Sequence, residues 1–252
     1  MSKWTWAAAS SKGTSHAQDG SRRQDAIACC TAAPDPSQFI GVLCDGAGSA
    51  SRGGEGASLV ARVMTIQARK HFATCTTGPD DETLLTWIDE ARETIYYAAS
   101  KRQLAPRDFA TTLICVLSNG FGTTIAHIGD GCAVARDVES GEWQALTWPA
   151  HGEYASTTYF VTDEQPRISI QRRNAEISAL VAFTDGMERL ALDFAAVRPH
   201  APFFEGVLGP VLQSSVIGRD AKLSHQLARY LDSPAVNART DDDKTLLVAA
   251  HR

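Results

Sequence analysis

The chain alternates short apolar runs with polar turns, and two long stretches of helical periodicity interrupt this alternation. The short runs are bounded by Gly, Pro, Asn, Asp or Ser, a pattern that predicts β-strands. The predicted strands cover residues 4–10, 26–32, 39–44, 110–117, 123–128, 133–136, 143–146, 179–184 and 245–250.

Two longer segments carry apolar residues at a spacing of three or four, which predicts amphipathic helices. The first covers residues 55–72 and the second residues 82–102, and a shorter helix is predicted over residues 221–231. In the second helix one apolar stripe is formed by Leu84, Ile88, Ala91, Ile95 and Ala99. Such helices bury their apolar face, and the neighbouring strands indicate that they pack on a sheet.

Turn signals connect many of the predicted strands directly. Asn119-Gly120 separates two apolar runs, which is the strongest short-range indication of a β-hairpin. Consecutive hairpins interrupted by blocks of helix predict an α+β fold with antiparallel sheets, not an alternating βαβ fold. The chain shows no internal repeat or low-complexity linker, so we predict that residues 1–252 form a single domain.

Composition and charge indicate which partners and which compartment to expect for this chain. The net charge of −5 over 252 residues gives no electrostatic reason to expect nucleic acid or an anionic membrane as partner. No apolar stretch is long enough to span a bilayer, and the N-terminal residues lack the apolar core of a secretory signal. The six cysteines form no C-x-x-C pair, which favours free thiols in a reducing cytoplasm. We therefore expect a cytoplasmic protein, and a monomer.

Two predicted strands are each followed by an Asp-Gly pair. Residues 39–44 lead into Asp45-Gly46, and residues 179–184 lead into Asp185-Gly186, while Asp25 and Asp243 precede strand-like runs. A single Asp-Gly after an apolar run is commonly just a turn. Several carboxylates at one rim of a sheet would repel one another unless divalent cations neutralise them, and oxygen ligands favour Mg²⁺ or Mn²⁺ over zinc.

Six short motifs together resemble those of the metal-dependent protein phosphatases of type 2C, over residues 13–248. Each motif is weak alone, but all six occur in the family's order. They are Gln24-Asp25, Asp45-Gly46-Ala47-Gly48, Thr111-Thr112, Gly129-Asp130-Gly131, Thr184-Asp185-Gly186 and Asp243-Lys244-Thr245. The resemblance implies a four-layer αββα fold, in which two antiparallel β-sheets pack as a sandwich flanked by α-helices.

The resemblance also implies roles for individual residues. Asp45 is expected to bridge two divalent ions, and the Gly46 carbonyl to complete one site. Asp185 and Asp243 are expected to bind the first ion, and Asp25 to hold metal-bound water. A water that bridges two such ions has a pKa lowered from about 15.7 towards neutrality, so that it can attack phosphorus without a protein nucleophile.

Two further features concern the metals and the rim of the cleft. Asp130 matches an aspartate that helps to bind a third ion in some family members. A second aspartate that binds this third ion in the family is replaced here by Arg189, so only two ions are expected. The segment between Asp130 and Asp185 is short for the family, whose flap subdomain lies there, and we expect a more open cleft.

The chain departs from the family where the substrate phosphate is bound. The family often has an arginine five residues before the first motif's aspartate, and here that residue is Gly20. Arg22 or Arg23 could bind the phosphate instead, although exposed arginines are common. His16 could contact phosphate or protonate the leaving group, but a lone loop histidine is more often structural. Lys244 replaces the family's asparagine and cannot accept a hydrogen bond.

Three functions agree with these residues. The first is a serine/threonine phosphatase acting on phosphoproteins, possible partners being a Ser/Thr kinase or its targets. The second is a small-molecule phosphohydrolase that uses the same metals, and the third is a catalytically silent module that binds phosphoproteins. The set of acidic motifs favours catalysis, and therefore the first.

Overall fold

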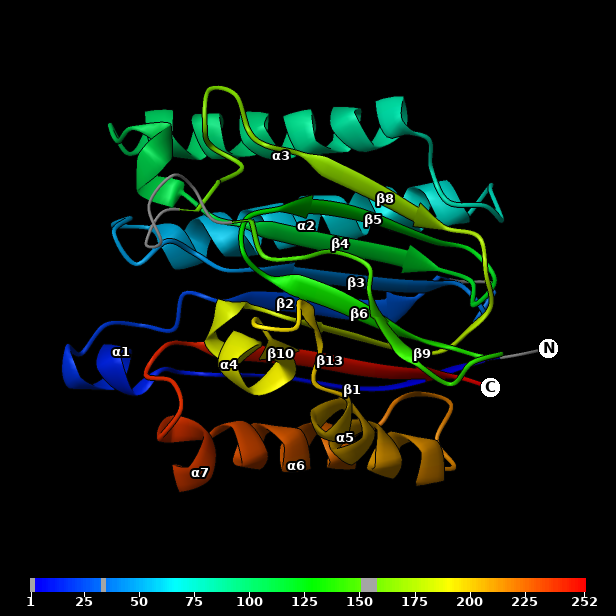
Figure 1. The fold of residues 1–252 in the computed structure, drawn as a ribbon. Helices are drawn as coiled ribbons and strands as arrows, with labels where there is room; N and C mark the ends of the chain where they lie inside the picture. Colours follow the sequence, from blue (N-terminus) through cyan, green and yellow to red (C-terminus); the bar gives the residue numbers. More distant parts are fainter. Residues whose placement is uncertain (1–2, 33–34, 151–157) are drawn as a thin grey trace.

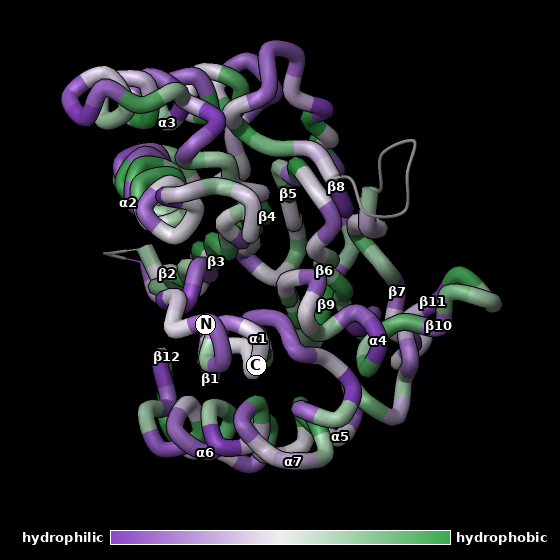
Figure 2. Tube along the Cα trace, turned by 90° about the vertical axis from the view of Figure 1, so that its left-hand side faces the viewer, coloured by the Kyte–Doolittle hydropathy of each residue, from purple (hydrophilic) through white to green (hydrophobic). Residues whose placement is uncertain are grey.

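The computed structural model describes residues 3–32, 35–150 and 158–252, and it has four layers (Figure 1). Two β-sheets pack face to face, and helices cover the outer face of each, as an end-on view shows (Figure 2). The predicted αββα sandwich is therefore confirmed. The helices in the described residues include none with the length and apolar character needed to cross a membrane.

One sheet has six strands in the order β12-β1-β13-β9-β6-β7. Its neighbouring strands are antiparallel, except that β1 and β12 run parallel. The strands are β12 (Gly218–Arg219), β1 (Trp4–Ser11), β13 (Lys244–His251), β9 (Ile177–Phe183), β6 (Cys132–Asp137) and β7 (Trp143–Ala145).

The second sheet has five strands in the order β2-β3-β4-β5-β8, all antiparallel to their neighbours. The strands are β2 (Ala26–Thr31), β3 (Phe39–Cys44), β4 (Leu113–Ser118), β5 (Thr123–Ile128) and β8 (Ser169–Arg173). A small separate hairpin pairs β10 (Leu192–Asp193) with β11 (Arg198–Pro199).

Two pairs of long helices form the outer layers. α2 and α3 lie over the five-stranded sheet, and α5 and α6 lie over the six-stranded sheet (Figure 1). The helices are α1 (Thr14–Gln18), α2 (Gly53–Phe72), α3 (Asp81–Lys101), α4 (Glu188–Ala191), α5 (Ala201–Gln213), α6 (Ala221–Leu231) and α7 (Pro234–Asn237), with short 3₁₀ turns at η1 (Pro106–Phe109) and η2 (Asp185–Met187).

The alternation of side chains along each strand divides the core into three apolar layers. On β13, Leu247 and Ala249 face the other sheet, whereas Leu246 and Val248 face the helices α5 and α6. Trp4 and Phe39 lie between the sheets with ring centroids 5.1 Å apart. Because β13 is buried on both faces, its sequence reads as a continuous apolar run rather than an alternating one.

Most of the predicted elements are confirmed, and the long helices begin and end within two residues of their predicted limits. The short helix α1 lies outside the predicted helices, and β8 lies outside the predicted strands. The six cysteines are free thiols, as predicted. Part of the shortened flap segment, residues 151–157, lies outside the described residues.

Candidate metal centre

Asp45 lies where β3 ends, and its backbone is fixed on both sides. Its N–H donates to the hydroxyl of Thr112 over 3.0 Å, and its carbonyl accepts from the Thr111 hydroxyl over 2.8 Å and from the Thr112 N–H over 2.8 Å. Both threonines are buried next to the start of β4. The Thr-Thr motif therefore holds the backbone of Asp45, so that its carboxylate is presented from a rigid strand end.

Three carboxylates meet at the rim where the two sheets adjoin. Asp45 follows β3 of one sheet, Asp185 follows β9 of the other, and Asp130 lies in the turn between β5 and β6. One oxygen of each carboxylate lies within 4.8 Å of the others, and all three residues are partly exposed. The strand ends thus bring together three of the predicted metal ligands, in a place that ions can reach from solvent.

The absence of a side chain at two glycines lets the surrounding segments approach. A Cβ added to Gly46 would lie 2.2 Å from the carbonyl carbon of Gly53, and one added to Gly186 would lie 2.0 Å from the carbonyl oxygen of Asp243. No side chain fits at either distance. The glycine in each Asp-Gly motif is therefore required by close packing of backbone around the site.

The crowding of carboxylates raises their pKa values. Burial, followed by the charges of Asp25 and Asp185, raises the pKa of Asp45 well above its usual range. Burial and then the charges of Asp130 and Asp242 raise the pKa of Asp185 to about 8. Raised pKa values mean that these carboxylates are stabilised when a proton or a cation neutralises their charge. A cluster of this kind is suited to binding a divalent ion.

Asp25 lies directly beside this group and is only 4% exposed. Its Oδ2 accepts from the hydroxyl of Thr184 over 2.9 Å and from that of Thr245 over 2.5 Å. Burial raises its pKa to about 6, partly offset by the hydrogen bond from Thr245. The two threonines fix the carboxylate in one orientation.

Two buried carboxylate oxygens of the centre have no hydrogen-bond donor among the described residues. They are Oδ1 of Asp25 and Oδ1 of Asp185. A buried carboxylate oxygen without a donor is costly, unless a cation or an ordered water satisfies it. The donor set consists of hard oxygens, and these unsatisfied atoms fit Mg²⁺ or Mn²⁺ with metal-bound water.

Asp243, which was also predicted to bind the first ion, lies outside the group of three carboxylates. Its carboxylate is 1% exposed and accepts from the N–H groups of Gly13 over 2.6 Å, Gln24 over 2.5 Å and Asp25 over 3.3 Å. It thus fastens residues 13–25 to the start of β13. The preceding residue, Asp242, is the one whose charge raises the pKa of Asp45 and of Asp185.

His16 also lies on Asp243 rather than among the three carboxylates. Its Nδ1 is 3.0 Å from Oδ1 of Asp243, and its side chain is 15% exposed. α1, which carries His16, is preceded by the N-cap residue Gly13, where an added Cβ would lie 2.5 Å from the carbonyl oxygen of Asp241. Through this contact, His16 helps to hold residues 13–25 against Asp243.

Arg22 and Arg23 are both exposed and line one groove. Arg23 is held by the sheet, since its Nη1 donates to the carbonyl of Ser10 over 2.8 Å. The groove also contains Arg52 and Glu55 of the first turn of α2, which the sequence did not single out. Only the fold brings these two segments together.

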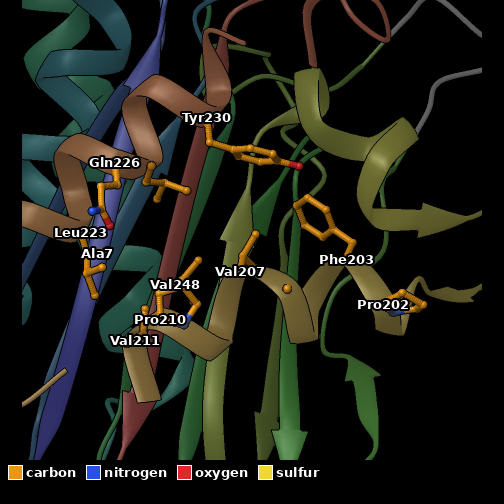
Figure 3. A pocket seen from close by; sticks show the side chains of 12 residues that line it. Ala7, Pro202, Phe203, Val207, Pro210, Val211, Leu223, Gln226, Tyr230 and Val248 are labelled. Atoms are coloured by element: carbon orange, nitrogen blue, oxygen red, sulfur yellow. The ribbon is translucent and has the colours of Figure 1, made fainter. Parts of the chain in front are cut away.

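A second cavity lies elsewhere, between α5 and α6 on the outer face of the six-stranded sheet (Figure 3). It has a volume of about 380 Å³, and apolar side chains such as Phe203, Val207 and Leu227 line it. Its described lining residues include no carboxylate, and Tyr230 and Gln226 supply its polar groups.

Comparison with known proteins agrees with this geometry. The model of the protein phosphatase 2C family matches residues 12–232. "Serine/threonine-protein phosphatase 3" of Escherichia coli (strain K12) is 37% identical over 250 residues, which cover 98% of each chain.

Solved structures share the fold at lower identity. Serine/threonine phosphatase Stp1 from Staphylococcus aureus matches with a TM-score of 0.63 and 19% identity, over 99% of this chain and 95% of that one. The catalytic domain of the serine threonine protein phosphatase PstP, in complex with two manganese ions, matches with a TM-score of 0.61 and 19% identity, over 100% and 99%. The chain belongs to the protein phosphatase 2C family.

Proposed function

We propose that the protein hydrolyses phosphoserine and phosphothreonine in other proteins, with two divalent cations held by the carboxylate rim. The observation that carries this proposal is the convergence of Asp45, Asp130 and Asp185 within 4.8 Å, from strand ends of both sheets. When bound, Mg²⁺ or Mn²⁺ would supply an activated water and neutralise the phosphoryl oxygens.

The ligand set that we propose differs from the sequence prediction at one position. Asp45, the Gly46 carbonyl, Asp185 and Asp242 would hold the ions. Asp242 takes the place predicted for Asp243, because Asp242 acts electrostatically on the other ligands while the carboxylate of Asp243 is used by backbone N–H groups. Asp130 would contribute a further carboxylate to the same group.

Asp25 positions the attacking water in this proposal. Its Oδ2 is held by two threonine hydroxyls, so Oδ1 remains to accept a hydrogen bond from that water. With a pKa raised to about 6, the carboxylate is a stronger base than an ordinary aspartate and is still mainly ionised near pH 7. It can therefore take up the proton that the water releases.

The described chain works as one catalytic unit in this proposal, and its compartment is the cytoplasm. The family match spans residues 12–232, and a core shared by both sheets joins the N-terminal and C-terminal strands. The cysteines in strands of both sheets are free thiols, which is typical of proteins in a reducing compartment.

The test is hydrolysis of a phosphothreonine peptide by the purified protein, measured with Mn²⁺, with Mg²⁺ and with EDTA. We expect turnover with either ion and none in EDTA. A parallel assay with small phosphate esters separates the classes of substrate: a kcat/KM for the peptide no higher than for the esters would argue against a protein phosphatase. Folded protein that turns over neither kind of substrate would contradict a catalytic role.

A further inference from the structure

A groove with a volume of about 580 Å³ opens beside the metal centre. One wall is formed by residues 21–24, which precede β2, and the other by residues 51–55 and Ser58 at the beginning of α2. The two walls are far apart in the sequence. Their contact is close, since a Cβ added to Gly54 would lie 3.0 Å from the Cα of Gln24.

The groove is continuous with the backbone of the centre. Gly53, which lines it, is in contact with Gly46, where an added Cβ would lie 2.2 Å from the Gly53 carbonyl carbon. Gln24 lines the other wall and directly precedes Asp25. A substrate segment whose phosphate is at the carboxylate rim can therefore extend along this groove.

The charge of the groove is positive. Arg22 and Arg52 are exposed, and neither forms an ion pair with another described residue. Glu55, the acidic residue among the described lining side chains, is paired with Arg102. Arg23 adds a third positive charge. An anionic ligand would meet two free guanidinium groups, each of which can bind a carboxylate in a bidentate manner.

We propose that this groove is a specificity subsite that binds an acidic side chain next to the phosphorylated residue of the substrate, with Arg22 and Arg52 as its recognition residues. The inference rests on the proposed phosphatase function and specifies its substrate class: phosphoproteins in which Asp or Glu flanks the phosphoserine or phosphothreonine. The two arginines approach the flanking side chain from opposite walls, so that recognition requires the assembled fold.

The test compares two phosphothreonine peptides that differ only in flanking residues, Glu in one and Gln in the other. We expect wild-type protein to prefer the Glu peptide in kcat/KM, and to do so less strongly as salt is raised, because exposed charge pairs are screened. Arg52→Gln is expected to reduce the preference about two- to fivefold, and Arg22→Gln with Arg52→Gln to reduce it further.

Arg62→Gln is the matched control, because Arg62 is an exposed arginine on the same helix that does not line the groove. It should leave the preference unchanged. An equal loss of kcat/KM for both peptides in Arg52→Gln would assign Arg52 to the transferred phosphate and overturn the subsite. A wild-type enzyme that turns over both peptides equally would overturn it too, whereas absence of turnover on any phosphopeptide would contradict the proposed function itself.

Discussion

At the scale of single residues, three consecutive aspartates before β13 have three different environments. Asp241 accepts through its backbone carbonyl from Ser15, the charge of Asp242 raises the pKa of Asp45 and of Asp185, and Asp243 is buried under residues 13–25. Sequence reasoning named Asp243 as the ligand at this sheet rim, although the sequence alone does not distinguish the three aspartates. The choice depends on the direction of each side chain, which is set by how residues 13–25 close over the strand.

The contrast between Asp242 and Asp243 gives a prediction. Asp242→Asn removes the charge of a proposed metal ligand, and we expect the Mn²⁺ concentration for half-maximal turnover to rise at least about tenfold. Asp243→Asn keeps an acceptor oxygen but removes charge-assisted hydrogen bonds from Gly13 and Gln24, so it should lower the free energy of unfolding by about 1–3 kcal/mol. Metal titrations and thermal unfolding of both variants check this; equal effects on metal dependence would contradict the assignment.

The raised pKa values predict an unusual pH dependence of stability without metal. Asp25, with a pKa of about 6, and Asp185, with a pKa of about 8, bind protons in the folded state that an unfolded aspartate releases near pH 4. Their contribution to stability is complete below about pH 4 and is lost as the pH rises through about 6 and 8.

The measurement is thermal unfolding of EDTA-treated protein between pH 5 and pH 8. These carboxylates should lower the melting temperature towards pH 8, and Mn²⁺ should restore it, because the cation binds the folded state in place of the protons. The Asp185→Asn variant serves as control, since it should show a smaller fall. A melting temperature that rises steadily to pH 8 without metal would argue against this electrostatic account.

At the scale of elements, α2 depends on close contact with its surroundings. Gly56 lies on its buried face, where an added Cβ would be 2.0 Å from the carbonyl oxygen of Phe109 in η1. This approach places the first turn of α2 beside Gly46 and the groove. The spacing of its apolar residues predicts this helix from the sequence. The need for its glycines cannot be predicted in the same way, because the atoms that they contact come from distant segments.

Two glycine substitutions test this contact. Gly56→Ala should destabilise the protein by about 1–3 kcal/mol, because the new methyl group forces the helix away from η1. Gly206→Ala in α5 is the control: apart from its chain neighbours and the backbone of its own helix, no described atom lies within 4 Å of its added Cβ, so the higher helix propensity of alanine should stabilise by about 0.5–1 kcal/mol. Chemical denaturation of both variants gives the comparison, and equal effects would contradict the packing described.

Elements without a strong apolar signature escape sequence reasoning for a physical reason. β8 reads Ser-Ile-Gln-Arg-Arg and is an edge strand without a fully buried side chain, so it is defined by its pairing with β5 rather than by an apolar run in the sequence. α1 is a single short helix without buried residues, fixed by Asp243 and Asp241. By contrast, β3 and β9 are buried runs that end in Asp-Gly, and their sequence alone indicated both strand and site.

At the scale of the whole molecule, the sandwich explains why the site lies where it does. Asp45 comes from the five-stranded sheet and Asp185 from the six-stranded sheet, so that their approach depends on how the two sheets pack. The layer between the sheets includes Trp4, Phe39 and Leu247, which are fully buried. The order of motifs predicted this arrangement through family resemblance, whereas the groove beside it required the folded chain.

In the proposed function, the carboxylate rim holds the cations needed for hydrolysis. The most direct measurement is calorimetric titration of Mn²⁺ into wild-type protein and Asp45→Asn, with phosphothreonine-peptide turnover measured on the same samples. We predict two bound ions per wild-type chain, and loss of at least one site in the variant together with a fall in kcat of about 10²-fold or more. A folded Asp45→Asn variant that keeps both ions and its turnover would contradict the account.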